Sequence, residues 1–254
     1  MVDPLQQFRL DGKVAIVTGA SSGLGEHFAR VLHAVGATVV VTARRAERLD
    51  GLVAELPGAV AIAADVSDAD ARERLVAETL ERVGRIDVLV NNAGISEVIG
   101  IEQESLDTFR SVLEVNTTAV WHLTKLCVPH MTERGSGSIV NVASMLGHVG
   151  SAPIKQANYC ASKGAVVNLT RELALQLGRK GVRVNALCPG YFPSEMTAGM
   201  ESDEGSVRYI QTYGGMPRMG EPHELDGALL LLATDAGSYV NGHSLLVDGG
   251  FTAR

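Results

Sequence analysis

The sequence predicts an α/β fold in which a doubly wound parallel sheet has helices on both faces. Short runs rich in valine and isoleucine are apolar throughout, which is typical of strands that helices cover on both sides. Amphipathic stretches of helical length separate these runs, and this alternation indicates parallel strands joined by right-handed crossovers. The expected strands are residues 13–18, 38–42, 59–64, 86–90, 138–142, 182–187 and 244–247.

The stretches between these strands predict the helices. Ser67 with Asp70 indicates a capped start for the third of them. No repeat, low-complexity tract or linker interrupts the chain, so we expect one domain over residues 1–254. The expected helices are residues 23–35, 45–56, 69–83, 106–132 and 158–178.

Composition excludes several classes of protein. The chain has 254 residues, 46 % of them apolar, which is enough for a core that needs no metal or disulfide. With 22 basic against 29 acidic side chains, the net charge of −7 argues against binding to nucleic acid. The longest aliphatic runs, such as residues 228–233, are too short to span a membrane, and residues 1–10 do not resemble a signal peptide.

Cysteine and histidine spacing predicts neither disulfides nor a metal. Cys127, Cys160 and Cys188 are odd in number and match no disulfide framework or zinc site. The histidines show no paired spacing with carboxylates, so no catalytic metal is expected. Together with the composition, these features predict a cytoplasmic protein with no membrane or nucleic-acid partner.

A glycine-rich turn lies between the first expected strand and the first expected helix. Glycines there allow a tight turn and a close approach to a pyrophosphate, whose charge is stabilised at a helix N-terminus. We therefore expect a dinucleotide to bind at Gly19, Ser21, Ser22, Gly23, Leu24 and Gly25.

The same turn also matches the nucleophile elbow of hydrolases, because Ser21 lies between Gly19 and Gly23. That site needs a serine after several earlier strands, with an acid and a histidine further along. Here the serine follows the first strand, so no upstream strand supplies the second oxyanion donor. The hydrolase interpretation is therefore disfavoured.

Two arginines indicate which dinucleotide binds. Arg44 and Arg45 end the second strand, where an acidic residue would bind the adenosine ribose hydroxyls. A guanidinium suits a 2′-phosphate, so we expect NADP(H) to be preferred and NAD(H) to be possible. The alternative is that the arginines open the next helix and face solvent. Glu47 lies on that helix, where it is poorly placed for the ribose.

A tyrosine and a lysine predict acid–base chemistry. Tyr159 and Lys163 are four positions apart on an expected helix and so share one face. A nearby ammonium should lower the tyrosine pKa from its usual value of about 10, so the phenol could exchange a proton with a substrate oxygen. Ser144 follows a strand, where its hydroxyl could hold that oxygen. Asn116 lies in an apolar stretch, either as a functional amide or as a satisfied core residue.

Taken in order, these motifs resemble the short-chain dehydrogenase/reductase family, in particular its branch of 3-oxoacyl-(acyl-carrier-protein) reductases and carbonyl reductases. The resemblance runs from about residue 12 to residue 250. The residues that carry it are the glycine-rich turn, Asp65, Asn91, Asn92, Ala93, Gly94, Asn116, Ser144, Tyr159, Lys163, Pro189, Gly190, and the Val-Asp-Gly-Gly segment at 247–250.

The resemblance implies a single Rossmann domain with a seven-stranded sheet, assembled as a homotetramer or homodimer. It implies that Tyr159 is the acid/base and that Ser144 polarises the substrate oxygen. Lys163 would bind the nicotinamide ribose and lower the tyrosine pKa, while Asn116 would hold a water in a proton relay.

The resemblance also implies where the cofactor lies. Asp65 and Val66 would flank the adenine, and Ser194 would lie near the nicotinamide carboxamide. Asn91, Ala93 and Gly94 would line the adenosine ribose side and steady the central sheet. The remaining expected cofactor contacts are Pro189, Gly190, Phe192, Tyr159 and Lys163.

The chain departs from the family pattern in two places. Ser144 and Tyr159 are further apart than is usual, so the loop at 147–157 is longer and is expected to shape the substrate pocket, with His148 near it. Ser22 stands where many NADP-preferring members have a basic residue. Enoyl reductases space the tyrosine and lysine further apart than here, so a reaction between alcohol and carbonyl fits better.

Residues 191–220 are expected to form a substrate lid. Apolar, adaptable side chains such as Met196 lie there among glycines, although they could instead pack on the sheet edge. An acidic rim of Glu195, Glu201, Asp203 and Glu204 disfavours phosphorylated carriers and mildly favours a small neutral ketone.

The expected function is that of an NADP(H)-dependent oxidoreductase, which transfers hydride between the nicotinamide and a carbonyl or secondary alcohol. The expected substrate is an apolar ketone or a 3-oxoacyl compound. One alternative is an NAD-dependent dehydrogenase of a secondary alcohol or polyol. A non-catalytic cofactor-binding sensor is disfavoured, because Asn116, Ser144, Tyr159 and Lys163 are all present.

Overall fold

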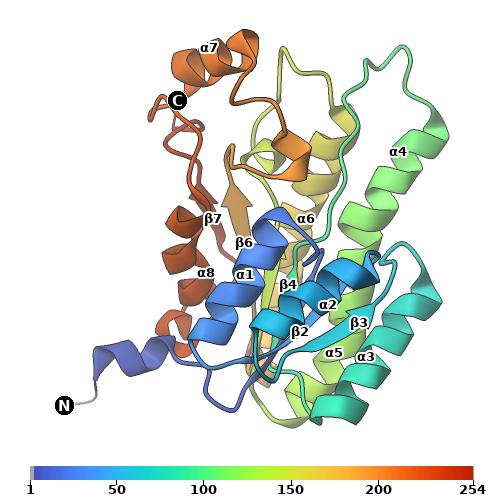
Figure 1. The fold of residues 1–254 in the computed structure, drawn as a ribbon, viewed down its shortest axis with the longest axis vertical. Coiled ribbons are helices and arrows are strands. Elements are labelled where there is room, and N and C mark those ends of the chain that lie inside the picture. Colours follow the sequence, from blue (N-terminus) through green and yellow to red (C-terminus); the bar gives the residue numbers. More distant parts are fainter. Residues whose placement is uncertain (1–2, 254) are drawn as a thin grey trace.

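A computed structural model describes residues 3–253 and contains one sheet of seven parallel strands (Figure 1). The strand order is β3-β2-β1-β4-β5-β6-β7, and every neighbouring pair is parallel. The predicted fold class is confirmed. The strands are β1 (Val14–Thr18), β2 (Thr38–Ala43), β3 (Val60–Ala63), β4 (Val88–Asn91), β5 (Gly137–Val142), β6 (Val182–Pro189) and β7 (Ser244–Val247).

Helices cover both faces of the sheet, which explains why the strands are apolar throughout (Figure 1). Ala15 and Val17 of β1 pack with one face's helices, whereas Val14 and Ile16 pack with the other's. The first face has α1 (Gly23–Ala34), α2 (Ala46–Glu55) and α8 (Asp226–Ala233); the second has α3 (Ala69–Val83), α5 (Ala119–Glu133) and α6 (Ala157–Leu177).

The expected helix at 106–132 is interrupted. It consists of α4 (Leu106–Leu113), a π-helical turn η2 (Glu114–Thr118) and α5. Asn116 lies in the middle of that turn and is fully buried. Single π-helical turns inside α-helices are frequent at functional sites, and the apolar periodicity alone did not reveal this one.

Two further details differ from expectation. The cap of α3 is Asp68, whose carboxylate accepts the Asp70 N–H at 3.0 Å, so the predicted Ser67 cap is wrong by one residue. Ser67 instead donates its hydroxyl to Asp65. The lid region contains a helix that the sequence did not predict, α7 (Glu204–Tyr213), because its many glycines and methionines indicate a loop.

Short 3₁₀ turns complete the described structure: η1 (Pro4–Phe8), η3 (Met145–Gly147), η4 (Gly178–Lys180), η5 (Glu195–Thr197), η6 (Pro222–Leu225) and η7 (Asp235–Gly237). Between residues 3 and 253, no helix is both long and apolar enough to cross a bilayer.

The strand order reverses between β1 and β4, which are neighbours although β2 and β3 separate them along the chain. At such a switch point the loops leave the sheet in opposite directions and open a crevice at the carboxyl edge.

At the amino edge, Asp87 ties β1 to β4. Its carboxylate accepts the Val14 N–H at 2.9 Å and two bonds from the Arg85 guanidinium at 2.8 and 2.7 Å. Burial alone would raise the pKa of this carboxyl, but the bonds from Arg85 and Val14 hold it below the usual value.

We expect Asp87→Asn to lower the free energy of unfolding at pH 7 by about 1–3 kcal/mol, because it weakens these charge-assisted bonds. A carboxyl group whose pKa is lower in the folded protein than in the unfolded chain stabilises the fold at pH values above its unfolded pKa. This stabilisation is lost as the pH falls through the folded pKa. Urea denaturation at pH 7 and pH 3.5 should therefore show the deficit shrinking at the lower pH. The exposed Asp50→Asn serves as control, and a deficit independent of pH would contradict the assignment.

Candidate active site

A cavity of about 430 Å³ opens at the carboxyl edge of the sheet. The turn after β1 and the residues that follow the next five strands line it. All the predicted cofactor residues except Asn91 are among the lining residues, and so are the predicted catalytic residues Ser144, Tyr159 and Lys163.

The first turn has the shape that a pyrophosphate requires. Gly19 has φ +67°, and a Cβ there would lie 2.8 Å from Ala93 Cα. A Cβ on Gly25 would overlap the Gly19 carbonyl oxygen. Ser22 begins α1 without a side-chain cap, so the first N–H groups of the helix remain available to an anion. This turn therefore fits the phosphates of a dinucleotide.

Asn91 does not line the cavity, so its predicted place beside the adenosine ribose is corrected. It is buried at the end of β4, where its amide donates to Asn141 Oδ1 of β5 at 2.9 Å. Asn141 in turn donates to Thr170 Oγ1 of α6 at 2.9 Å. The side chain thus joins the strands to a helix beneath the site, in keeping with its expected role in steadying the sheet.

The next residue, Asn92, does line the cavity, although the family resemblance to which it contributes implied no role for it. Its amide donates to the Thr18 carbonyl at 2.9 Å. The N–H groups of Asn92 and Ala93 both donate to Thr18 Oγ1 at 3.0 Å. These bonds hold Ala93 against Gly19 and thereby fix the floor of the cavity.

The two arginines lie at one end of the cavity. Arg44 is exposed, and its charge is one of several influences on Asp65. Arg45 does not simply face solvent: its guanidinium donates to Ser21 at 2.9 Å and to Ser22 at 2.8 Å, and pairs with Glu195 at 2.8 Å. A doubly charged phosphate placed here would meet two guanidinium groups.

Asp65 follows β3 and lies beside these arginines. The Ser67 N–H, at 2.9 Å, is the main cause that holds the pKa of this carboxyl below its usual value. The Ser67 hydroxyl and Arg44 act in the same direction, while burial opposes them. Asp65 is therefore ionised at neutral pH and can accept a hydrogen bond at the end of the cavity where the arginines lie.

Ser144 and Tyr159 meet at the other end of the cavity. Ser144 follows β5, where its hydroxyl accepts the Leu146 N–H at 3.1 Å and begins η3. Tyr159 lies in the first turn of α6 and hydrogen-bonds the Ser144 side chain. A substrate oxygen placed between these two hydroxyls would have a donor on each side.

The expected lowering of the tyrosine pKa is not found. Burial raises the pKa of Tyr159 to about 12, and the bond with Ser144 offsets this only in part. Lys163 Nζ lies 5.5 Å from the centre of the phenol ring and donates to the Val142 carbonyl at 2.7 Å. Burial lowers the pKa of Lys163 itself to about 8. Desolvation thus outweighs the attraction that the spacing implied, and Tyr159 is protonated at neutral pH.

Asn116 does not line the cavity and is held in place by its neighbours. Its Oδ1 accepts the Ile95 N–H at 2.9 Å, and its amide donates to the Ile95 carbonyl and to Ser162 Oγ, both at 2.9 Å. Both amide N–H groups are therefore used, so a relay water could bond only to Oδ1 or to the main chain. The side chain fixes the segment after Gly94 against α6.

Arg72 is a buried cation near the site that the sequence analysis missed. It donates to the Val66 carbonyl at 2.7 Å, to Glu114 at 2.8 Å and to His122 Nδ1 at 3.0 Å. It thus joins the residue expected beside the adenine to the π-helical turn that carries Asn116. The sequence offered no specific signal for it, since an arginine in a helix is usually exposed.

Residues 191–220 contribute Phe192 and residues 194–197 to the lining of the cavity and continue through η5 into α7. Tyr209 of α7 packs on Tyr191, Tyr213 and Phe251 with ring centres 5.0 to 6.1 Å apart. Its hydroxyl donates to the Ala152 carbonyl at 3.3 Å, which joins α7 to the long loop at 147–157. This aromatic cluster adjoins Met145, Leu146 and Tyr159.

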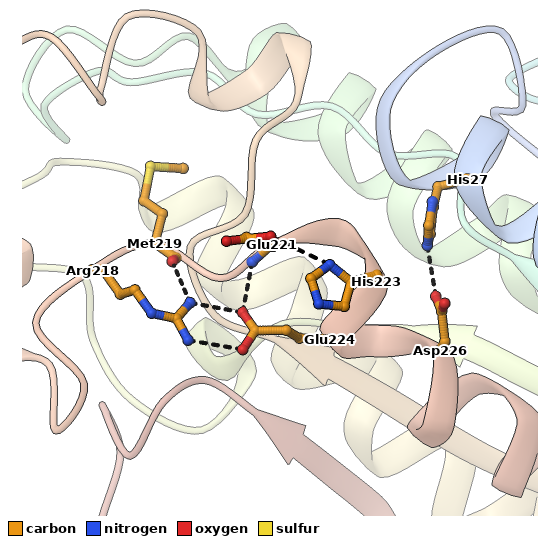
Figure 2. A network of polar contacts seen from close by, with 7 residues as sticks. All are labelled: His27, Arg218, Met219, Glu221, His223, Glu224 and Asp226. Atoms are coloured by element: carbon orange, nitrogen blue, oxygen red, sulfur yellow. Dashed lines mark hydrogen bonds and ion pairs between the residues drawn. The ribbon is translucent and has the colours of Figure 1, made fainter.

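The far end of this segment is anchored to the 3₁₀ turn before α8. Figure 2 shows the Arg218 guanidinium against both oxygens of Glu224, at 2.7 and 2.8 Å. The Glu221 N–H also donates to Glu224 at 2.7 Å, and His27 of α1 meets Asp226 at 2.6 Å. These contacts fix the end of the segment, while Met196 and Met216 within it remain half exposed.

His148 lies outside the residues that line the cavity. It is exposed, and its Nε2 lies 3.7 Å from Cys188 Sγ. Burial and the charge of Arg171 lower its pKa. Within residues 3–253, no group of three or more histidine, cysteine, aspartate or glutamate side chains could hold a metal ion.

Comparison with known proteins assigns the family. A family profile described as enoyl-(acyl carrier protein) reductase matches residues 19–252. Galactitol 2-dehydrogenase (L-tagatose-forming) of Cereibacter sphaeroides is 43 % identical over 96 % of this chain and 97 % of its own length. A 3-oxoacyl-[acyl-carrier-protein] reductase of Thermotoga maritima is 37 % identical over 95 % of this chain and 98 % of its own.

A solved structure agrees. The gluconate 5-dehydrogenase of Burkholderia cenocepacia in complex with NADP and tartrate superposes with a TM-score of 0.93 at 34 % identity, over 99 % of this chain and all of that one. The chain belongs to the short-chain dehydrogenase/reductase family. The expectation of an oxidoreductase of this family is thereby confirmed, and neither relative is named as an enoyl reductase.

Burial of Lys163 makes stability depend on pH. Its pKa is lowered in the folded protein, so the unfolded chain binds more protons between about pH 8 and pH 10.5 and stability rises with pH across that window. We expect wild type to gain stability relative to Lys163→Met between pH 7.5 and pH 9.5. Thermal unfolding at both values measures this, with the exposed Lys180→Met as control. Parallel pH profiles for wild type and Lys163→Met would refute it.

Proposed function

We propose that this protein is an NADP(H)-dependent oxidoreductase that transfers hydride between the nicotinamide and a carbonyl or secondary alcohol of a small molecule. The observation that carries the proposal is that one cavity joins a phosphate-binding turn and two arginines to the Ser144, Tyr159 and Lys163 side chains. The remaining cofactor-binding assignments made from the sequence, Asn91 excepted, are part of this proposal.

The catalytic residues act together on one oxygen. When bound, the reduced nicotinamide supplies the hydride. Ser144 holds the carbonyl oxygen by a hydrogen bond, and Tyr159 donates its phenolic proton to that oxygen as negative charge develops. Tyr159 is protonated at neutral pH, so it can act as the proton donor in the reductive direction. When Lys163 carries charge, it is close enough to Tyr159 to stabilise the phenolate that remains after the proton has left.

The substrate proposed is a small uncharged ketone or a 3-oxoacyl compound. The aromatic cluster beside Tyr159 supports a substrate with an apolar substituent. The sequence similarity to a 3-oxoacyl-[acyl-carrier-protein] reductase supports a substrate with a 3-oxo group.

A second candidate is the oxidation of a polyol. The relative named galactitol 2-dehydrogenase favours it.

Further parts of the proposal concern organisation. Residues 1–254 act as one domain with a lid at about 191–220, and copies assemble as a homotetramer or homodimer. Exposed apolar side chains on α4, α5 and α6, namely Leu106, Trp121 and Leu175, support an oligomer. A cytoplasmic location, without nucleic-acid or membrane partners, stays a prediction from the sequence.

Tyr159→Phe should lower kcat by about 10²- to 10⁴-fold, because it removes the proton donor. The Kd for NADPH should stay within error, since the ring that lines the cavity is retained. Initial rates on a ketone and fluorescence titration of NADPH measure both quantities, with the fully exposed Tyr239→Phe as control. Retention of most activity would disprove the mechanism.

Arg44→Met should weaken the binding of NADPH by about tenfold and leave the binding of NADH nearly unchanged, because only NADPH offers a 2′-phosphate to the lost guanidinium.

Wild-type rates with each cofactor are compared on an aliphatic ketone, an aryl ketone, a free 3-ketoester and acetoacetyl-coenzyme A. A wild-type preference for NADH would overturn the cofactor assignment and favour alcohol oxidation with NAD.

A further inference from the structure

The Arg45–Glu195 pair lies within the cavity that the cofactor is proposed to occupy. Arg45 follows β2, whereas Glu195 begins η5 in the lid, 150 positions further along the chain. The two guanidinium Nη atoms donate to the two carboxylate oxygens of Glu195 at 2.8 and 3.1 Å. Both residues line the cavity, and both side chains are partly exposed there.

The rest of the Arg45 guanidinium is bound to the glycine-rich turn. Nη2 also donates to Ser22 Oγ at 2.8 Å and to Ser21 Oγ at 2.9 Å, and Nε reaches Ser21 Oγ at 3.2 Å. Ser22 stands where many NADP-preferring family members have a basic residue. Arg45 thus supplies a cation beside the position at which this sequence lacks one. The Glu195 carboxylate neutralises that cation where a 2′-phosphate would need it.

Glu195 is held there by a well-bonded turn. Ser194 Oγ accepts the Thr197 N–H at 3.3 Å, while Thr197 Oγ1 accepts the Ser194 N–H at 2.9 Å and donates to the Phe192 carbonyl at 2.6 Å. The Ser194 side chain also lies 3.3 Å from the position of a Cβ built on Gly23. The turn therefore rests directly on the glycine-rich turn and presents its carboxylate to Arg45.

We propose that Glu195 competes with the 2′-phosphate of NADP(H) for Arg45, and so limits the preference of this protein for NADP(H) over NAD(H). This inference rests on the proposed function, which places a dinucleotide in the cavity. A 2′-phosphate brings a charge near −2, similar to that of a phosphorylated side chain, whereas the 2′-hydroxyl of NAD(H) brings none. Only NADP(H) therefore has to displace or repel the Glu195 carboxylate.

Glu195→Gln tests the proposal, since it keeps the side-chain size and removes the charge. An exposed ion pair of this kind contributes little to folding, so the variant should fold normally. We expect the Kd for NADPH to fall by about fivefold while the Kd for NADH is unchanged. Glu201→Gln is the matched control, because it removes the same charge from the lid at a residue that makes no hydrogen bond to Arg45.

A fragment experiment locates the effect at the phosphate without any turnover. Adenosine 2′,5′-bisphosphate should bind about fivefold more tightly to Glu195→Gln than to wild type, and adenosine 5′-monophosphate equally well to both. Isothermal titration with each fragment gives these values.

The outcomes separate this inference from the proposed function. If wild type binds neither dinucleotide, the proposed function fails. If wild type binds NADPH but Glu195→Gln changes neither constant, or changes those for NADPH and NADH equally, only the competition is refuted. If NADPH binds more weakly to the variant, Glu195 orients Arg45 for the phosphate, and the proposal is overturned.

Discussion

The hydrogen bonds between Thr18 and the segment after β4 hold β1 and β4 together at the switch point, and the candidate site depends on this junction. Strands β1 and β4 are adjacent only because the chain reverses its direction of winding there, and the crevice opens above them. One threonine accepts two N–H groups from Asn92 and Ala93, while its carbonyl accepts the Asn92 amide. Since Ala93 is packed directly against Gly19, a shift of either strand would distort the phosphate-binding turn. The fold and the candidate cofactor site therefore share this constraint.

Burial determines the proton chemistry of the site more than proximity does. Tyr159 and Lys163 are neighbours, yet each is displaced toward its neutral form because the charged form is poorly solvated. At neutral pH Tyr159 keeps its proton and can deliver it to a carbonyl oxygen, whereas Lys163, with a pKa of about 8, still carries its charge for the most part.

The sequence predicted those parts of the structure that depend on local pattern. Valine-rich runs that are apolar throughout predict buried parallel strands, and glycines between strand and helix predict an anion site, because both effects act over a few residues. It could not predict that Asn91 turns into the sheet, since its partner Asn141 belongs to another strand. The π-helical turn around Asn116 and the pairing of Arg45 with Glu195 likewise depend on contacts between distant segments. The tyrosine pKa was predicted in the wrong direction because helical spacing reports a neighbour but not the loss of water around it.

The carboxyl-terminal segment packs into the cluster that adjoins Tyr159. Phe251 packs with Met145 and Leu146, and the Gly249 carbonyl accepts the Met216 N–H from the lid at 2.7 Å. The described amino-terminal turn η1 instead lies at the opposite end of the molecule (Figure 1). An affinity tag or fusion partner attached after Phe251 would therefore load the cluster beside Tyr159, whereas one placed before η1 would be attached at the far end of the molecule. For any kinetic study of this enzyme, the choice of tag position is itself an experimental variable.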